Sequence, residues 1–246
     1  MKNFSEIKLL MYKCSIITSI YNAEKFIVGF IENCLEQEDL ESFEFLLLDA
    51  ASDDRTQEII LSYELPKNFI YKRLDKKYSI YETWNIGVDL ASSEILTNWN
   101  TDDRKKNNSL KIHSDYMEVN PECDVSYGYV AWSRKPNETY EKGNLLELYP
   151  CESPQRGFLL GHNSPHNMPF WRKSLHANHG YFDTTWATAA DHEFWLRCHH
   201  AGANFQKINQ IMGLYYYNPA GLSTKAETTS QQEGQEIREI YREKGY

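Results

Sequence analysis

Short apolar runs alternate with amphipathic stretches over the first hundred residues, and this alternation constrains the fold more than any other feature. The runs cover residues 14–20, 43–49, 69–73 and 95–99, and β-branched and aromatic side chains are frequent in them. Between the runs, apolar residues recur at helical spacing over 26–35, 56–63 and 80–91. The pattern predicts an α/β domain with an open, mostly parallel sheet flanked by helices.

The run at 43–49 is apolar with little alternation, so we expect a central strand that is buried on both faces. In sheets of this kind, ligands bind in the crevice beyond the carboxyl ends of the strands. Ser19, Asp49 and Asp102 lie at such ends. The sequence therefore predicts a ligand site at this edge of the sheet.

The second half of the chain does not continue this regular alternation of strands and helices. We expect a helix over 110–119, a strand over 125–132, a helix over 189–201, short strands within 204–217 and a polar helix over 227–244. Residues 133–169 are rich in Pro, Gly, Asn and Ser and are predicted to form ordered loops over a substrate cleft. We interpret residues 1–246 as a single domain.

Composition excludes several classes of protein. A formal net charge of −9 argues against a nucleic-acid partner, which would require a basic face. Five cysteines without any Cys-x-x-Cys spacing fit no closed disulfide framework and indicate a reducing compartment. The first twelve residues interrupt their apolar positions with charges, unlike a secretory signal, and no window resembles a membrane span. The sequence predicts a soluble, cytoplasmic protein.

Adjacent carboxylates, Asp102 and Asp103, follow the apolar run at 95–99. Two neighbouring carboxylates repel one another and lose solvation when a strand end buries them. A cation, a sugar hydroxyl or plain exposure to water would each explain the pair.

Five segments, taken in order, resemble the family-2, inverting, nucleotide-sugar glycosyltransferases of GT-A fold. The five segments are Ser-Ile-Ile-Thr-Ser-Ile-Tyr-Asn at 15–22, Leu-Asp-Ala-Ala-Ser-Asp-Asp-Arg-Thr at 48–56, Ile-Tyr-Glu-Thr-Trp-Asn-Ile-Gly at 80–87, Asn-Thr-Asp-Asp at 100–103 and Ala-Asp-His-Glu-Phe-Trp-Leu-Arg at 190–197. The resemblance spans nearly the whole chain. It implies a nucleotide-sugar-binding half over about 12–104, an acceptor-side half over 105–217 and a helical tail over 218–246.

The resemblance also implies residue roles. Ser19, Tyr21 and Asp49 would contact the base of the donor, and Asp102 its ribose. Asp103, with Asp102, would hold Mn²⁺ or Mg²⁺, ions that prefer oxygen ligands.

An acceptor hydroxyl that attacks the anomeric carbon must lose its proton to a positioned base. Asp191, which is expected to begin a helix, matches the family's position for that base. Asn85, His162 and His166 are further candidates for substrate contact.

The implied activity is transfer of a single sugar from a nucleotide-diphosphate sugar to a hydroxyl of a glycan, glycolipid or glycoprotein. A UDP-sugar is the first candidate for the donor, with hexosyl or N-acetylhexosaminyl transfer in surface-polysaccharide assembly. The Gln-x-x-Arg-Trp signature of processive synthases is absent from the sequence. Peripheral contact with the inner face of a membrane, where a lipid-linked acceptor would lie, stays open.

Departures from the family pattern leave alternatives open. Ala50 follows Asp49 where many relatives have a second Asp, and Ser79 stands where Gly is usual. A sugar nucleotidyltransferase would need a Gly-rich phosphate loop after the first strand, and residues 19–25 contain no Gly. A catalytically inactive, sugar-binding relative would be expected to have lost Asp103 or Asp191.

Several prominent residues have a structural interpretation. Trp84, Phe194 and Trp195 are expected in the core, and Asp54 is expected to cap the second helix. Arg197 is expected to tie its helix to the fold. The basic run at 104–106 is interpreted as a solvated charge run, with phosphate attraction as the alternative.

Overall fold

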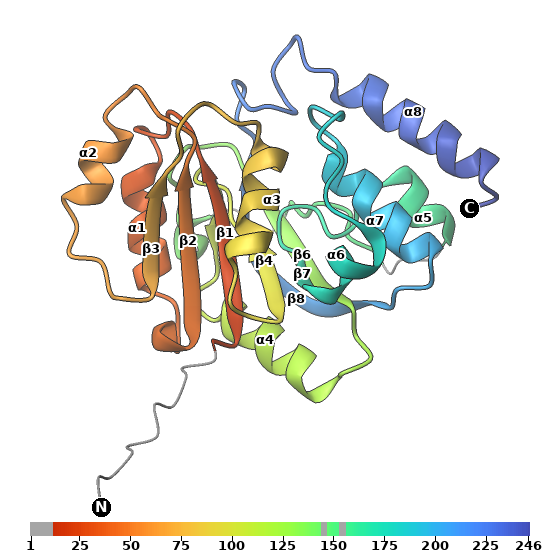
Figure 1. The fold of residues 1–246 in the computed structure, drawn as a ribbon, viewed down its shortest axis with the longest axis horizontal. Coiled ribbons are helices and arrows are strands. Elements are labelled where there is room, and N and C mark those ends of the chain that lie inside the picture. The colour runs from red at the N-terminus through yellow and green to blue at the C-terminus, as the bar shows by residue number, and fades with distance from the viewer. Residues whose placement is uncertain (1–11, 144–146, 153–155) are drawn as a thin grey trace, which may run out of the picture.

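The computed structural model of the chain describes residues 12–143, 147–152 and 156–246 (Figure 1). The N-terminal segment that the sequence argues is no secretory signal lies almost wholly outside the described residues. The strands are β1 (Cys14–Ile20), β2 (Phe43–Asp49), β3 (Phe69–Arg73), β4 (Ile95–Asn98), β5 (Arg104–Lys105), β6 (Val125–Ser133), β7 (Phe170–Arg172) and β8 (Phe205–Tyr216). The α-helices are α1 (Ile27–Leu35), α2 (Thr56–Leu61), α3 (Ile80–Leu90), α4 (Ser109–Val119), α5 (Arg156–Gly161), α6 (Ser174–His179), α7 (Ala190–His200) and α8 (Ser230–Glu243), with short 3₁₀ turns at Leu40–Ser42 and Tyr140–Lys142.

The strands form one eight-stranded sheet in the order β3-β2-β1-β4-β7-β6-β8-β5. The first four strands of the chain pair in parallel, as the alternation of strands and helices predicts. β7 runs antiparallel to both β4 and β6, which makes the sheet mixed although mostly parallel. The predicted fold class is therefore confirmed, with β5 and β7 as additional strands.

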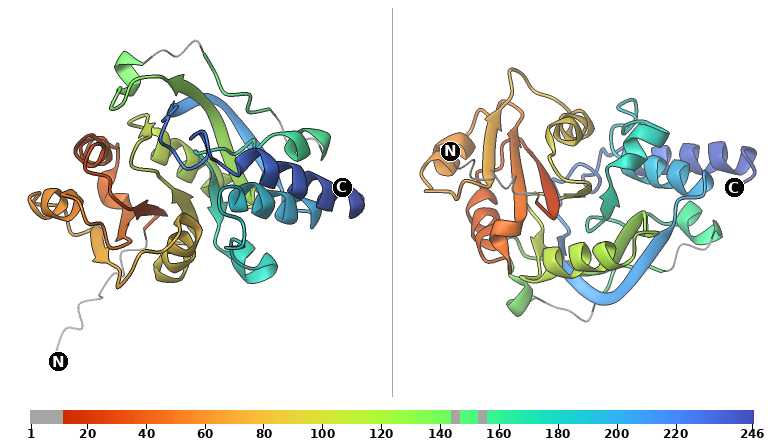
Figure 2. Two further views of the ribbon diagram at one scale, coloured as in Figure 1. Left: turned by 90° about the horizontal axis from the view of Figure 1, so that it is seen from above. Right: turned by 60° about the horizontal axis from the view of Figure 1, so that its bottom comes forward.

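The two faces of the parallel strands pack against different helices (Figures 1 and 2). Ile16 and Phe45 face the core that includes α1, α2 and α4, whereas their neighbours Ile17 and Leu46 face the core that includes α3 and α7. Side chains alternate between faces along a strand, so a strand buried on both sides reads as a continuous apolar run. All seven residues of β2 are buried, as expected for a central strand.

The predicted core aromatics are confirmed. Trp84, Phe194 and Trp195 are 5%, 0% and 1% exposed, and all three belong to the core beneath α3 and α7. Ser79, which replaces the family's glycine, caps α3: its hydroxyl accepts from the amide of Glu82, whose carboxylate accepts from the amide of Ser79. This reciprocal arrangement fixes the first turn of α3.

The interpretation of residues 104–106 as a solvated charge run is wrong for its first two members. Arg104 and Lys105 form β5 and are 3% and 0% exposed. The Lys105 ammonium lies 5.5 Å from the centroid of the Trp99 ring and 3.3 Å from the sulfur of Met168. Arg104 Nη1 donates to the carbonyl oxygens of Thr101 and Asp103. Pairing with β8 and these contacts account for the burial.

The segment at 133–169 is more regular than expected, because it contains α5 and an isolated bridge between Leu148 and Ala131. Residues 205–216 form one long strand, β8, instead of the predicted short strands. The pairing of β8 with β6 shifts register on either side of Tyr129, so the ladder continues through an irregularity.

All five cysteines are buried and free, which agrees with the absence of a disulfide framework. None of the helices within the described ranges is long and apolar enough to span a bilayer.

Candidate functional site

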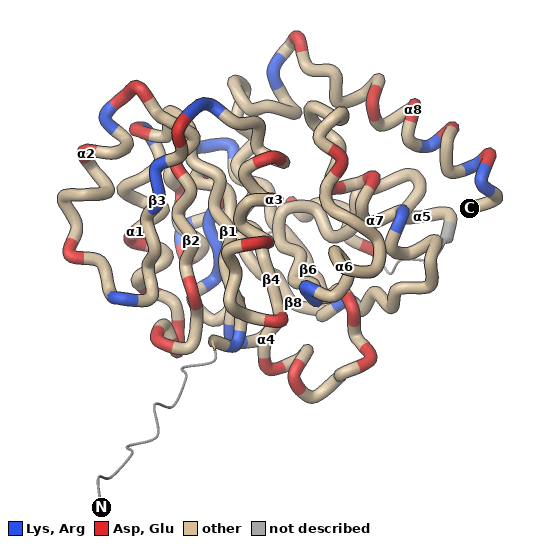
Figure 3. Tube along the Cα trace, viewed as in Figure 1, with Lys and Arg blue, Asp and Glu red and all other residues tan. Residues whose placement is uncertain are grey.

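Three predicted donor-site residues lie along the carboxyl edge of the neighbouring strands β1 and β2. Ser19 is half-buried at the end of β1, and Tyr21 follows that strand with 38% of its surface exposed. The ammonium of Lys77 lies 4.1 Å from the centroid of the Tyr21 ring. The loop between β3 and α3 thus brings a positive charge to this edge, drawn in blue at the top of Figure 3.

Asp49 is fully buried at the end of β2. One carboxylate oxygen accepts from the amide of Ser52 at 2.8 Å. The other accepts from the Tyr71 hydroxyl and from Arg73 Nη1, each at 2.8 Å. The carboxylate thereby holds the turn after β2 and fixes the guanidinium of Arg73 beside the predicted base site.

Asp54 has the structural role that the sequence predicts. Its carboxylate accepts from the amide of Thr56, the first residue of α2, at 2.9 Å. The other oxygen accepts from the amide of Glu24 at 3.0 Å, which joins the loops after β1 and β2.

The adjacent acids Asp102 and Asp103 lie between β4 and β5, on the loop that leads out of the parallel half. Asp103 is 1% exposed, and its oxygens accept from the amide of Tyr216 and the side-chain amide of Asn100, both at 3.1 Å. Asp102 accepts from Asn218 Nδ2 at 3.0 Å. Both acids are therefore hydrogen-bonded to residues that come more than one hundred positions later in the chain, at separations of 113 and 116.

Burial and mutual repulsion perturb both acids. Burial, followed by the negative charge of Asp102, raises the pKa of Asp103 to about 7. Burial also raises the pKa of Asp102 above its ordinary value, against a hydrogen bond from Asn218. A bound cation would relieve the desolvation and the repulsion together.

The acid pair fits a hard divalent cation as two of its ligands. Carboxylate oxygens are the ligands that Mg²⁺ and Mn²⁺ prefer, and Mg²⁺ sites of this kind draw further oxygens from substrate phosphates and water. Within the described residues, no group of three or more His, Cys, Asp or Glu side chains is arranged to hold a metal. Two protein carboxylates plus a diphosphate would match that arrangement.

Asp191 occupies the first turn of α7, as expected, and is half-buried. One carboxylate oxygen accepts from the Tyr81 hydroxyl at 3.0 Å, and the other accepts from Asn163 Nδ2 at 2.7 Å. The N-terminal end of a helix favours a carboxylate electrostatically. Both oxygens are therefore held in fixed directions by residues from α3 and from the loop after α5.

His166 packs against two tyrosine rings. Its ring centroid is 3.8 Å from that of Tyr149 and 4.5 Å from that of Tyr215, and its Nδ1 lies 2.9 Å from Asn167 Oδ1. The backbone of His166 has a φ of 47°, in the left-handed region. A non-glycine residue held in this region is often over-determined by its surroundings.

Contacts that run through His166 link the acids. Its amide donates to the carbonyl of Asn163 at 3.1 Å, and Asn163 is the residue whose side chain donates to Asp191. On the other side, its ring lies edge-on to that of Tyr215, and the amide of the next residue donates to Asp103. Burial lowers the pKa of His166, and the negative charge of Asp191 opposes this effect. Asp103 and Asp191, which are 88 positions apart in the sequence, are thus joined through one cluster built around His166.

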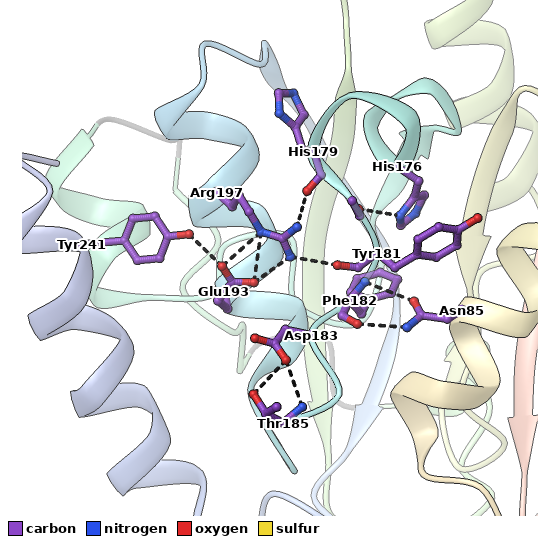
Figure 4. A network of polar contacts seen from close by, with 11 residues as sticks. Asn85, His176, His179, Tyr181, Phe182, Asp183, Thr185, Glu193, Arg197 and Tyr241 are labelled. Carbon is purple, nitrogen blue, oxygen red and sulfur yellow. Dashed lines mark hydrogen bonds and ion pairs between the residues drawn. The ribbon is translucent and has the colours of Figure 1, made fainter.

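The remaining two candidates for substrate contact have other surroundings. Asn85 of α3 is engaged internally: its amide donates to the carbonyl of Phe182 at 2.9 Å and accepts from the amide of Phe182 at 3.1 Å (Figure 4). His162 is exposed after α5 and stacks on Phe158 with ring centroids 4.7 Å apart. Of the three candidates, His166 is the one joined to the acids.

Arg197 ties α7 to the fold, as predicted. Figure 4 shows its guanidinium between Glu193, one turn earlier on α7, and the carbonyls of His179 and Tyr181. The hydroxyl of Tyr241, on α8, donates to the same Glu193 at 2.8 Å. Sequence reasoning assigned no role to Tyr81, Asn163 or Asn167. Tyr81 lies in the family-like segment 80–87, but its contact with Asp191 could not be predicted from that segment, and Asn163 and Asn167 have no local signature.

Known proteins resemble this chain in sequence and in fold. A model of the family described as glycosyl transferase family 2 matches residues 15–178. An uncharacterized glycosyltransferase of Methanocaldococcus jannaschii is 23% identical over 208 residues, which is 82% of this chain and 69% of that protein. A PGL/p-HBAD biosynthesis glycosyltransferase of Mycobacterium bovis is 27% identical over 184 residues, which is 74% of this chain and 68% of that protein.

Solved structures share the fold at low identity. S. aureus TarS, solved over residues 1–349 in complex with UDP, matches 92% of this chain with a TM-score of 0.70 and 18% identity. The mannosyltransferase PcManGT of Pyrobaculum calidifontis, solved with GDP-Man and Mn²⁺, matches 86% of this chain with a TM-score of 0.64 and 15% identity. The chain spans 64% of that TarS structure and 59% of that PcManGT structure.

Proposed function

Because the chain belongs to glycosyl transferase family 2, we propose that it transfers a single sugar from a nucleotide-diphosphate sugar to an acceptor hydroxyl, with inversion at the anomeric carbon. The observation that carries this proposal is a chain of contacts between the acids. It runs from Asp191 through Asn163 to the backbone of His166, and from the His166 ring through Tyr215 and the amide of Tyr216 to Asp103. Inversion by a single displacement needs a base on the side of the anomeric carbon opposite the leaving diphosphate. In this proposal Asp191 is that base, and Asp102 and Asp103 lie on the side of the diphosphate.

The donor occupies the edge of the parallel strands in this proposal. Ser19, Tyr21 and Asp49 serve its base, and Asp102 serves its ribose. The exposed ring of Tyr21 and the nearby ammonium of Lys77 suit an aromatic base and an anionic phosphate. A UDP-sugar is the first candidate, since S. aureus TarS was solved with UDP and with UDP-GlcNAc. A GDP-sugar is the second, after PcManGT with GDP-Man.

Asp102 and Asp103 hold Mn²⁺ or Mg²⁺ in this proposal. When bound, such an ion neutralises the charge that grows on the leaving diphosphate. The shared burial and repulsion of the two carboxylates favour a site that gains a cation. Asn100, Asn218 and the amide of Tyr216 hold the carboxylates in place through hydrogen bonds.

Asp191 takes the proton of the acceptor hydroxyl. Tyr81 and Asn163 orient its carboxylate, and their hydrogen bonds leave further lone pairs on the same oxygens for an incoming hydroxyl. The amide of His166 donates to the carbonyl of Asn163, the residue that holds this carboxylate, and in the proposal His166 contacts substrate. Burial holds its pKa below the usual value, so the ring is neutral near pH 7.

The acceptor is a hydroxyl of a glycan, a lipid-linked glycan or a glycoprotein, in surface-polysaccharide assembly. The transferred group is a hexosyl or N-acetylhexosaminyl unit. The name of the Mycobacterium bovis relative assigns that protein to PGL/p-HBAD biosynthesis, which supports a role in building cell-surface glycans. A cytoplasmic protein that touches the inner face of a membrane would reach such an acceptor.

A thermal-shift screen of UDP- and GDP-sugars, with Mn²⁺ or with EDTA, tests this function. A donor at one hundred times its dissociation constant should stabilise the protein by about 2.7 kcal/mol, which corresponds to roughly 5–10 °C in Tm. The shift should require Mn²⁺ and should disappear in Asp103→Ala. A matched Asp89→Ala variant, on the exposed side of α3, should keep it. No shift with any nucleotide-sugar would contradict the proposal.

A further inference from the structure

Helix α8 makes hydrogen bonds at two places, to the residues just before α7 and to α7 itself. Glu233, in the first turn of α8, lies against the residues that lead into α7, and Tyr241 hydrogen-bonds Glu193 within α7. Figures 1 and 2 show α8 running alongside α5 and α7. Because Asp191 lies in the first turn of α7, these hydrogen bonds influence the position of its carboxylate.

The carboxylate of Glu233 accepts hydrogen bonds from five donors among the described residues. Three are the consecutive backbone amides of Ala187, Thr188 and Ala189, at 3.1, 2.8 and 3.1 Å. The others are the hydroxyls of Thr188 and Thr229, at 2.9 and 2.6 Å. Successive amides that converge on one anion make a strong, directional site.

We infer that Glu233 is a positioning residue for the proposed glycosyl transfer: it fixes residues 187–189, and through them the start of α7 and the direction of the Asp191 carboxylate. Ala189 is the N-cap of α7, two residues before Asp191. Glu233 therefore binds the amide of the N-cap residue and the two amides before it, whereas the N-cap residue itself offers no side-chain hydrogen bond. This inference rests on the proposed function.

Glu233 is not itself a candidate for the base. It is 9% exposed, and its two oxygens are occupied by the five donors. Burial acts to raise its pKa, but hydrogen bonds from Thr229, Thr188 and Ala187 outweigh burial and hold the pKa below the ordinary value. A carboxylate with so many donors is a poor proton acceptor and a good anchor.

Glu233→Gln tests the inference, because it keeps the shape of the side chain but replaces one acceptor oxygen by a donor. Glu239→Gln is the matched control, since Glu239 is exposed on the same helix. Hydrogen exchange of a peptide covering residues 187–191 should accelerate in Glu233→Gln and stay unchanged in Glu239→Gln. Unchanged exchange in Glu233→Gln would overturn the inference without any activity measurement.

Steady-state kinetics separate positioning from stability. The readout is nucleoside diphosphate released from UDP-GlcNAc or GDP-mannose with water as the acceptor of the sugar, measured at least 15 °C below the Tm of each variant. Misplacement of a catalytic group by about 1 Å can cost about 100-fold, so kcat should fall by roughly tenfold to 100-fold while KM for the donor stays the same. A lower Tm with unchanged kcat would overturn the inference and leave Glu233 a purely structural residue. If the wild-type protein releases diphosphate from no nucleotide-sugar, the proposed function fails, and hydrogen exchange alone then tests whether Glu233 fixes residues 187–189.

Discussion

The hydroxyl of Tyr81 donates a hydrogen bond of 3.0 Å to the carboxylate of Asp191, joining the second residue of α3 to the first turn of α7. Tyr81 is 4% exposed, and burial together with the charge of Asp191 holds the pKa of its hydroxyl well above the usual range. The hydroxyl therefore stays a donor at any working pH. It stabilises the charged form of Asp191, which is the form that a base requires.

Tyr81→Phe should slow diphosphate release, because it removes a hydrogen bond that orients the Asp191 carboxylate and leaves the ring in place. A hydrogen bond to a charged group is worth about 1.5–3 kcal/mol, so kcat should fall by roughly tenfold to 100-fold while the Kd for the donor stays the same. Tyr78→Phe removes a similar hydroxyl, bonded to Asp75 on the surface, and should leave kcat unchanged. An unchanged kcat in Tyr81→Phe would contradict the role of this hydrogen bond.

Asp103→Asn should stabilise the metal-free protein at neutral and alkaline pH. Burial and the charge of Asp102 raise the folded-state pKa of Asp103 to about 7, whereas an unfolded Asp has a pKa of about 3.9. Between these values the folded state binds the proton and the unfolded state does not, so stability falls as pH rises through this window. Asn carries no charge at any pH, so the free energy of unfolding of the variant should not fall in this pH window.

The Tm difference between Asp103→Asn and the wild-type protein, measured in EDTA, should therefore be small near pH 4 and grow up to pH 7–8. At the upper end we expect a gain of roughly 1–3 kcal/mol, or about 3–10 °C. Addition of Mn²⁺ and donor should stabilise the wild-type protein alone. A difference that is constant from pH 4 to pH 8 would contradict the assignment of the raised pKa to this carboxyl.

Gly87→Ala should destabilise the fold, because α3 approaches β1 closely at this glycine. A Cβ at Gly87 would lie 2.3 Å from Cγ2 of Ile17, which is fully buried in the core. Overpacking of this kind typically costs about 1–3 kcal/mol. Gly157→Ala is the control, since a Cβ there meets no atom of the described residues within 4 Å. Chemical denaturation should show the loss in the first variant alone, and Ile17→Ala in the same background should recover part of it.

Local sequence signals predicted the elements whose pattern is internal to a segment. Residues 14–20 and 43–49 match β1 and β2 to the residue, because buried parallel strands have a continuous apolar signature. β7, of three residues, and β5, of two, have no such signature and exist because neighbouring strands pair with them. The burial of Lys105 was likewise beyond prediction, since it depends on aromatic rings from β7 and the end of β4.

The residues of the candidate site also fall into those that the sequence predicts and those that it does not. The acids at strand ends could be found from the pattern of elements, and Asp191 from the resemblance to the family. Asn163, Asn167 and Glu233 could not, since a single polar residue in a loop or on a surface helix has many roles. Their contacts with Asp191, with the ring of His166 and with residues 187–189 arise only in the folded chain.

The most direct test of the account is Asp191→Asn, measured for donor binding and for diphosphate release in parallel. Asn keeps the shape of the side chain but cannot take a proton, and loss of a general base costs about 100-fold to 10,000-fold in rate. We predict that the Kd for the donor with Mn²⁺ stays within a factor of two while diphosphate release falls by that amount. Release at the wild-type rate with undiminished donor binding would contradict the assignment of Asp191 as the base.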